Sequence, residues 1–315
     1  MKKTLILLAF ILFGGIVASA QSNLLSPDGT YVYEKRDTCD LFLDIYYPAK
    51  GSPQKINGVQ KPTIVFMFGG GFVAGSRDSE SYNPWFRMLT ENGYRVISID
   101  YRLGLKGSSK VGVAQVNVLD KAIHMAVEDL FSATNFIIDN AESLGVDPKN
   151  IVISGSSAGA ISVMQAEYEL ANNTSWASVL PQDFNYAGVM SFAGAILSRK
   201  GKVKYAKEPC PTLMMHGTAD KVVPYKQIAV LNLGFFGGAK LAERFKKFGY
   251  DYNMYHFMDY GHEIASSMHS TFDLQLDFLE ENVIQGKKRI IEAWISDPDV
   301  WKGSKYKSRK DIYSK

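Results

Sequence analysis

The sequence contains little cysteine and little histidine. Only two cysteines, Cys39 and Cys210, and five histidines occur among 315 residues. They form no cluster at metal-ligand spacing, so we predict neither a metal nor an organic cofactor. Cys39 precedes the second predicted strand and Cys210 the seventh. The two thiols should therefore lie far apart and stay unpaired.

Beyond the N-terminus, the chain also has no apolar run long enough to cross a bilayer, which takes about 20 residues. It has no repeats, heptads or low-complexity segments. Residues 1–20 are different, because two lysines precede an apolar stretch that ends in Ala18-Ser19-Ala20. This pattern is typical of a secretory signal peptide cleaved before Gln21. We therefore predict an exported protein, secreted or periplasmic, with no integral membrane segment after cleavage.

A strong excess of one charge is absent as well. The net charge is +3, and loss of the leader with its two lysines leaves +1. This balance gives no electrostatic reason to expect nucleic acid or anionic lipid as a partner. Residues 287–315, however, hold nine Lys or Arg against four Asp or Glu. We expect a solvated basic C-terminal extension there; the alternative is weak attachment to an acidic surface or polysaccharide.

The part of the chain between leader and tail, residues 21–286, suits one large α/β domain. Short β-rich runs alternate with stretches of helical period, which predicts a parallel sheet covered by helices on both faces. The predicted strands are 30–36, 40–47, 63–68, 94–101, 151–154, 187–192, 212–216 and 253–257. The predicted helices are 82–92, 116–144, 158–170, 226–248 and 267–281, and 49–61 is expected to be a surface loop.

The most informative motif lies at residues 151–159, an apolar run that ends in Gly155-x-Ser157-x-Gly159. A buried strand that leads into this turn and then into a helix is typical of a nucleophilic serine. The two glycines let strand and helix approach closely around a strained serine. Taken alone, the motif could also be an ordinary glycine-rich turn.

A serine nucleophile needs a base beside it and a third group that orients the base. In the α/β arrangement predicted here, such residues follow in the order Ser, then Asp or Glu, then His along the chain. The acid follows a late strand and the histidine follows the last strand. Asp220 comes shortly after the strand at 212–216, and His262 shortly after the strand at 253–257. We therefore predict Ser157, Asp220 and His262 as nucleophile, acid and base.

Alternatives exist for two of these positions. Asp251 and Asp259 are the rivals for the acid, and a helix-capping role is the structural alternative for Asp220. The base is chosen by elimination, because only His262 lies in a glycine-marked loop at the right place. The other histidines are expected on helices or within strands; they are His124, His216, His256 and His269.

A further motif, Phe68-Gly69-Gly70-Gly71-Phe72, directly follows the strand at 63–68. Acyl transfer passes through a tetrahedral oxyanion, which preorganised backbone N–H groups can stabilise. Consecutive glycines let the backbone turn its amides inward, because no Cβ stands in the way. We predict the N–H groups of Gly70, Gly71 and Ala158 as the oxyanion hole.

These motifs, together with Ile99-Asp100-Tyr101-Arg102-Leu103 and Gly261-His262, resemble those of the α/β-hydrolase superfamily. The resemblance extends over residues 30–285 and is strongest to the carboxylesterase and hormone-sensitive-lipase-like branch. It implies an eight-stranded, mostly parallel sheet flanked by helices, with little or no cap, and ester hydrolysis through an acyl-serine. Within that branch the chain is similar to bacterial exported carbohydrate esterases that remove acetyl or feruloyl groups.

One residue departs from the family pattern, which has histidine where this chain has Phe68. Phenylalanine cannot make the polar contacts of that histidine, so the positioning of the oxyanion loop becomes an open question. The segment 172–184 is the only obvious cap material, with Trp176 as either a pocket wall or a packing residue. Two other functions stay open: a prolyl-oligopeptidase-like peptidase without a propeller, and a non-catalytic binding protein of the same fold.

Overall fold

A computed structural model describes residues 25–107 and 116–296. Its main sheet has nine strands in the order β1-β2-β6-β5-β7-β8-β10-β13-β14. β1 and β6 run antiparallel to β2, and every other pair is parallel. The strands are β1 Gly29–Arg36, β2 Cys39–Tyr46, β5 Thr63–Met67, β6 Arg95–Ile99, β7 Ile151–Ser156, β8 Gly188–Phe192, β10 Thr212–Gly217, β13 Tyr252–Phe257 and β14 Ile290–Ile295.

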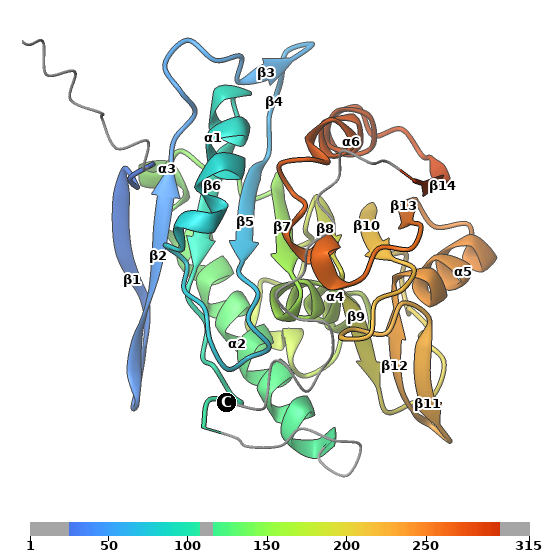
Figure 1. The fold of residues 1–315 in the computed structure, drawn as a ribbon. Helices are drawn as coiled ribbons and strands as arrows, with labels where there is room; N and C mark the ends of the chain where they lie inside the picture. The colour runs from blue at the N-terminus through green and yellow to red at the C-terminus, as the bar shows by residue number, and fades with distance from the viewer. Residues whose placement is uncertain (1–24, 108–115, 297–315) are drawn as a thin grey trace, which may run out of the picture.

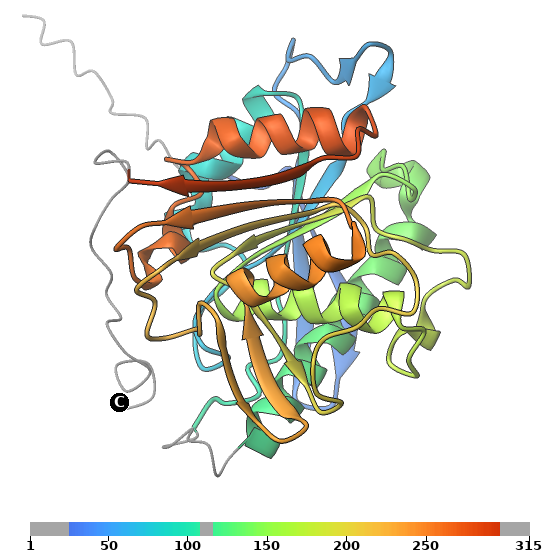
Figure 2. The same ribbon diagram turned by 90° about the vertical axis from the view of Figure 1, so that its right-hand side faces the viewer.

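Helices cover both faces of this sheet (Figures 1 and 2). One face carries α1 and α6, which are joined by a hydrogen bond from Trp85 Nε1 to Gln275 Oε1 (2.7 Å). The other face carries α2, α4 and α5. The helices are α1 Asn83–Glu91, α2 Val116–Asp139, α3 Ala141–Leu144, α4 Ala158–Ala171, α5 Gly238–Phe248 and α6 Phe272–Asp277, which continues as a π-helix over Phe278–Ile284. Short 3₁₀ turns lie at Glu80–Tyr82, Ala177–Val179 and His262–Ser266.

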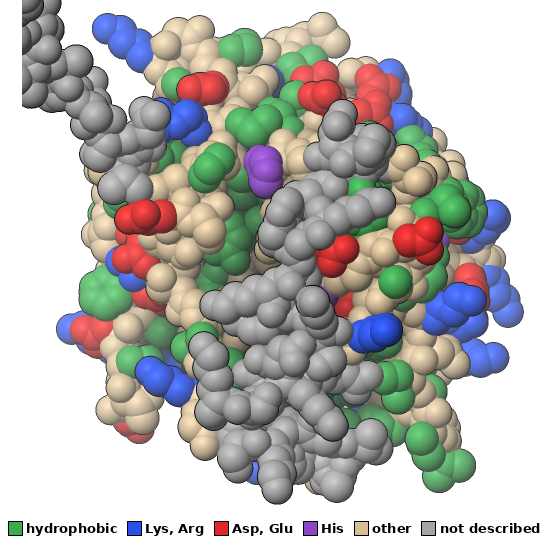
Figure 3. All heavy atoms as spheres, in the orientation of Figure 1, with side chains coloured by type: hydrophobic (Ala, Val, Ile, Leu, Met, Phe, Trp, Pro, Cys, Tyr) green, Lys and Arg blue, Asp and Glu red, His purple; other side chains and the backbone are tan. Residues whose placement is uncertain are grey.

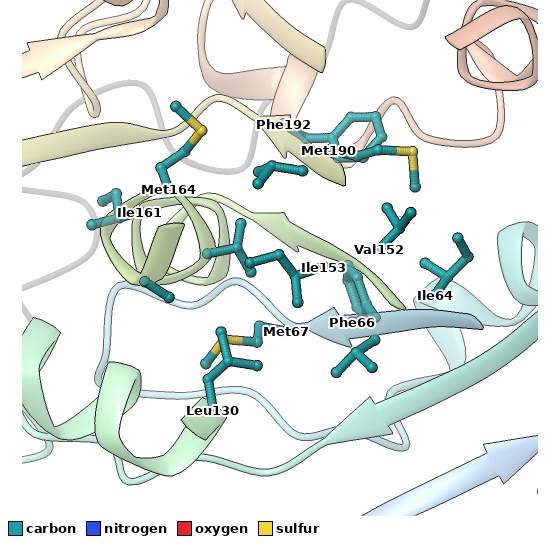
Figure 4. Close-up of a cluster of buried hydrophobic side chains, with 14 of the residues drawn as sticks. Ile64, Phe66, Met67, Leu130, Val152, Ile153, Ile161, Met164, Met190 and Phe192 are labelled. Atoms are coloured by element: carbon teal, nitrogen blue, oxygen red, sulfur yellow. The ribbon is translucent and has the colours of Figure 1, made fainter. Parts of the chain in front are cut away.

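The core lies between the central parallel strands and these helices. Every residue of β5, β7, β8 and β10 is buried, as expected of strands covered on both faces. Figure 4 shows side chains of β5, β7 and β8 gathered with Ile161 and Met164 of α4 and Leu130 of α2. This packing fixes the carboxyl ends of the strands. The loops that hold Ser157, Asp220 and His262 follow the strand ends.

The predicted α/β-hydrolase fold is confirmed, but several details of the prediction are wrong. The sheet has nine strands rather than eight, because β14 pairs in parallel with β13 through six residue pairs. Strand β14 lies within the stretch predicted as a C-terminal extension, so the sheet continues to Ile295. Residues 297–315 of the predicted tail, and the predicted leader at 1–20, lie outside the described residues.

The helix predicted over 226–248 begins only at Gly238. Its first part is a hairpin of β11 (Gln227–Val230) and β12 (Leu233–Gly237), which pairs with β9 (Ala195–Ser198) in a small second sheet. The β-branched and aromatic residues of 227–236, together with a turn at Leu231 (φ 53°), favour strands over a helix. The predicted loop 49–61 also contains a two-residue hairpin, β3 (Lys55–Ile56) with β4 (Val59–Gln60).

Two further predictions concern thiols and membranes. Cys39 and Cys210 are both free thiols, as predicted, because four strands of the sheet separate β2 from β10. Among the described helices, none is both long and apolar enough to span a bilayer. On the face shown in Figure 3, acidic and basic side chains are interspersed.

Candidate active site

Ser157 lies in the turn between β7 and α4, with φ 50° and ψ −111°. A positive φ is strained for a residue other than glycine, and such strain is typical of functional sites. The Ser157 N–H donates to the carbonyl of Phe192 at 2.9 Å, which ties the turn to β8. A Cβ on Gly155 would lie 2.3 Å from the Gly159 backbone, and one on Gly159 only 2.1 Å from the Met67 carbonyl oxygen. Both glycines of the motif are therefore required by close backbone approach.

The structure brings the three predicted residues into one hydrogen-bonded chain. Ser157 Oγ lies 2.8 Å from His262 Nε2, and His262 Nδ1 lies 2.8 Å from Asp220 Oδ2. The three side chains come from loops that follow β7, β13 and β10, so the ends of parallel strands bring them together. All three residues are buried, with 6–9% of their surface exposed.

The Asp220 carboxylate is held by more than His262. Its Oδ1 accepts the backbone N–H groups of Val222 (2.8 Å) and Val223 (3.0 Å). Its Oδ2 lies 3.3 Å from His216 Nε2. Burial alone would raise the pKa of Asp220, but the hydrogen bonds from His216 and His262 outweigh burial and lower this pKa below its ordinary value. Asp220 is therefore an anion that can stabilise a positive charge on His262.

His216 is a partner that the sequence interpretation missed, because we expected a plain structural role within its strand. The Gly238 N–H donates to His216 Nδ1 at 3.4 Å, which assigns the ring proton to Nε2, the atom that faces Asp220. The signal was present in the sequence, since His216 and Asp220 lie four residues apart around the turn at Gly217. The rival acids are elsewhere: Asp251 accepts hydrogen bonds from Asn282 and Arg289, and Asp259 is exposed.

The triple-glycine loop lies beside the serine turn. Gly70 and Gly71 have φ 135° and 65°. A Cβ on Gly69 would lie 3.3 Å from Ser157 Cβ, which shows how closely the loop approaches the serine. Ala158 is the first residue of α4, so its N–H has no carbonyl partner within the helix. The structure thus places the three predicted oxyanion donors on the two backbone segments next to Ser157.

The aromatic residue at position 68 is fully integrated into this loop. The Phe68 ring is buried and stacks on the Tyr101 ring, with centroids 4.4 Å apart and an interplanar angle of 25°. Tyr101 Oη also donates to the Phe68 carbonyl at 2.8 Å. Apolar stacking and one tyrosine hydroxyl therefore hold the loop where the family pattern has a histidine. Tyr101 is a second residue whose contribution the sequence interpretation missed.

The segment 172–184 does not extend toward the serine. Trp176 stacks on His124 of α2, with centroids 3.7 Å apart, and the Val179 carbonyl accepts a hydrogen bond from Asn135 of the same helix. Trp176 therefore packs this segment onto α2, and it also lines a cavity of about 430 Å³ with Gln165 and Tyr168, to which Ser157 does not belong. Within residues 25–107 and 116–296, no group of three or more His, Cys, Asp or Glu side chains could hold a metal ion.

Comparisons with known proteins agree with the fold described above. Residues 43–196 match the BD-FAE family. A thermophilic esterase from Thermogutta terrifontis superposes with a TM-score of 0.58 at 26% identity, over 80% of this chain and 91% of that one. Its propionate-bound form gives a TM-score of 0.55 at 25% identity, over 79% and 94% of the two chains.

Two curated relatives match over shorter stretches. Esterase B1 of Culex pipiens is 32% identical over 36% of this chain, and Lipase 1 of Geotrichum candidum is 29% identical over 52%. The matched segments span 20% and 27% of the length of those two proteins. The chain therefore has the α/β-hydrolase fold, and the relatives and structural neighbours described above are esterases and a lipase.

Proposed function

We propose that this chain is a serine esterase that hydrolyses carboxylic esters through an acyl-serine intermediate. The observation that carries the proposal is the hydrogen-bonded chain Ser157–His262–Asp220, with 2.8 Å at each step. A serine hydroxyl becomes a good nucleophile when a histidine accepts its proton and an anion orients that histidine. The esterase neighbours and the BD-FAE match over 43–196 support the same reaction.

The reaction begins when Ser157 Oγ attacks the ester carbonyl while His262 Nε2 accepts the hydroxyl proton. The negative oxygen of the tetrahedral intermediate is stabilised by the N–H groups of Gly70, Gly71 and Ala158. Asp220 stabilises the imidazolium that forms on His262. When the intermediate collapses, the bond from the carbonyl carbon to the alcohol oxygen breaks, and His262 returns its proton to the leaving alcohol.

The second half of the reaction releases the acid. His262 removes a proton from a water molecule, and the resulting hydroxide attacks the acyl-serine carbonyl. Collapse of this second intermediate breaks the bond to Ser157 Oγ, which recovers its proton from His262. The proton that enters or leaves at each step is carried by His262, and water supplies the second nucleophile.

For the substrate, we infer an ester of a bulky alcohol, such as an acetyl or feruloyl ester of a carbohydrate. The motif resemblance to carbohydrate esterases supports this inference, and so does the packing of segment 172–184 onto α2 rather than over Ser157. The propionate bound by the Thermogutta terrifontis esterase favours the acetyl group of these two. The leader-like residues 1–20 support export, which suits a polymeric substrate outside the cell.

The test is a hydrolysis panel with purified protein. Aryl esters of increasing acyl length, acetylated xylan, methyl ferulate and a prolyl peptide amide are compared for the wild type and for Ser157→Ala. We expect hydrolysis of short aryl and carbohydrate esters that Ser157→Ala abolishes. Cleavage of the peptide amide in preference to the esters would favour the peptidase alternative. Wild-type protein that hydrolyses nothing, or a Ser157→Ala variant with full activity, would contradict the proposal.

A further inference from the structure

The oxyanion loop, residues 68–77, runs beside the segment that follows β6. At the start of the loop, Tyr101 Oη donates to the Phe68 carbonyl at 2.8 Å. In the middle of the loop, the Leu105 N–H donates to the Phe72 carbonyl at 2.9 Å. These two contacts flank the glycines that are predicted to stabilise the oxyanion.

An ion pair holds the far end of the same loop. Arg77 donates to both carboxylate oxygens of Asp100, from its backbone N–H to Oδ1 at 3.4 Å and from Nη1 to Oδ2 at 2.7 Å. The hydroxyl of Ser98, which is buried in β6, donates to the Arg77 carbonyl at 2.8 Å. Asp100 directly precedes Tyr101, so two adjacent residues after β6 hold the two ends of one loop.

This ion pair is anchored in the sheet. Arg77 Nε lies 3.0 Å from Oδ2 of Asp44, a residue of β2 with 1% of its surface exposed. The Asp100 N–H donates to the Phe42 carbonyl of the same strand at 2.8 Å. β2 and β5 lie on either side of β6 (Figure 1). Because a guanidinium presents its N–H groups in a rigid plane, one that meets two carboxylates fixes direction as well as distance.

Further contacts fix both the loop and the segment beside it. The Gly69 N–H donates to Tyr82 Oη at 3.0 Å. Arg102 donates to the Asp129 carboxylate of α2 from its backbone N–H at 2.7 Å and from Nε at 2.9 Å. Asp129 is fully buried. The segment after β6 is therefore held by the sheet on one side and by α2 on the other.

We propose that Arg77 and Asp100 are positioning residues for ester hydrolysis. Their ion pair holds the end of the oxyanion loop, so that the predicted donors Gly70 and Gly71 face the reacting carbonyl. Both residues act through the backbone of the loop rather than on the substrate. This inference rests on the proposed function, because it assigns a role within that reaction.

The test uses Arg77→Lys and Asp100→Asn, with Arg289→Lys as the matched control. Lysine keeps the positive charge beside the two carboxylates but lacks the planar fork that meets both of them. In Asp100→Asn, the amide NH₂ faces a donor of Arg77 where a carboxylate oxygen accepted. Arg289 makes a similar two-point pair with Asp277, at 3.2 and 3.0 Å. It directly precedes β14, at the amino ends of the parallel strands, whereas the candidate site lies at their carboxyl ends.

Kinetics should separate positioning from binding. In both variants we expect kcat on an aryl acetate to fall about 10-fold with KM within about 2-fold, because oxyanion donors act on the transition state and small misplacements slow the chemical step. An aryl trifluoromethyl ketone forms a tetrahedral adduct when Ser157 Oγ bonds to its carbonyl carbon. Its affinity should fall by the same factor as kcat/KM. Arg289→Lys should change none of these values.

Hydrogen exchange gives a readout that does not depend on the substrate. Amides of residues 69–77 should exchange faster in Arg77→Lys and Asp100→Asn than in the wild type, because the loop opens more often when its end is released. Exchange of the same amides should be unchanged in Arg289→Lys. If Arg77→Lys does not fold, Asp100→Asn carries the same expectations.

The positioning role is contradicted if exchange at 69–77 is unchanged in the two variants, or if kcat stays within about 2-fold of the wild type. A lower melting temperature with unchanged kcat per folded molecule would likewise show a merely structural role. Failure of the proposed function looks different, since the wild type would then hydrolyse no ester while the exchange difference at 69–77 persists.

Discussion

The ring of Phe68 stacks on the ring of Tyr101, and the hydroxyl of the same tyrosine donates to the Phe68 carbonyl. One residue thus holds both the side chain and the backbone of the position that precedes the triple glycine. Together with Gly75 and Met125, the two aromatic residues line a cavity of about 390 Å³. The stacking of Phe68 on Tyr101 therefore supports the oxyanion loop by apolar packing. This contact explains how phenylalanine can occupy a position that is polar in the family pattern.

Phe68→Ala should lower both stability and activity. Loss of a buried phenylalanine costs about 3–5 kcal/mol of unfolding free energy, because a cavity replaces the ring. The loop also loses the surface on which it rests, so kcat per folded molecule should fall as well. Urea unfolding and kcat on an aryl acetate are the measurements. Phe245→Ala, a buried site in α5, is the control: a similar stability loss is expected there, with kcat per folded molecule unchanged.

Asp220→Asn should leave His262 without the carboxylate that orients its ring. An amide in this place donates to His262 where the carboxylate accepts, which favours the wrong tautomer, and a loss of about 10⁴ in kcat is expected by analogy with serine proteases. Steady-state kinetics of the purified variant measures it. A variant that keeps more than a tenth of the wild-type kcat would contradict the assigned role of Asp220.

Asp220 should also make the free energy of unfolding depend on pH. Because folding lowers the pKa of Asp220, its carboxylate stabilises the folded state above the unfolded pKa of about 3.9, and this contribution is lost as pH falls through the folded pKa. Wild-type unfolding free energy should therefore fall below about pH 4, whereas Asp220→Asn should show a weaker fall. Asp183→Asn, at an exposed aspartate, should follow the wild-type curve.

For Glu167 we expect the opposite effect of pH on the free energy of unfolding, at higher pH. Burial raises its pKa to about 7, although the Cys210 N–H donates to the carboxylate at 2.9 Å. The folded state then binds more protons than the unfolded state between about pH 4.5 and 7, so stability falls as pH rises. Glu167→Gln should remove this loss and be more stable than the wild type at pH 8 by up to about 3 kcal/mol. Urea unfolding at pH 5 and pH 8 tests this, with exposed Glu142→Gln expected to be neutral at both.

Truncation at the predicted domain boundary tests whether β14 contributes to the stability of the fold. Removal of residues 287–315 deletes β14, whose Trp294 stacks on His256 of β13 at 4.5 Å. That variant should melt at least about 5 °C below the full chain, because the β13 edge loses its partner strand. A chain that ends after Ser296 keeps β14 and is the matched comparison. Equal melting temperatures for the two truncations would contradict a structural role for β14.

Local patterns were sufficient to predict eight of the nine strands of the main sheet and the site motifs. Short-range patterns predicted the buried strand before Ser157, the glycines around it, and the loops that hold Asp220 and His262. The order of these motifs along the chain was then enough to assign the three residues to one site. The hairpin at 227–237 was missed because its apolar residues also fit a helical period. β14 was missed because an edge strand with half-exposed residues has a weak pattern, and only its pairing with β13 defines it.

The supporting hydrogen bonds could not be read from the sequence for a related reason. Tyr82, Tyr101 and His216 act through partners 13 or more residues away or across a turn, and the sequence does not say which hydroxyl or ring nitrogen reaches which backbone group. Their positions depend on how β5, β6 and β10 align in the sheet. Register of that kind is a tertiary property.

The most direct test of the account is covalent labelling of the purified wild-type protein with paraoxon, followed by peptide mass spectrometry. The account predicts a single diethylphosphoryl adduct on Ser157, formed in step with loss of aryl acetate hydrolysis and absent from Ser157→Ala. His262→Ala should label far more slowly. An active wild-type protein that stays unlabelled at Ser157, or carries the adduct on another residue while activity is lost, would contradict the assignment of Ser157 as the nucleophile.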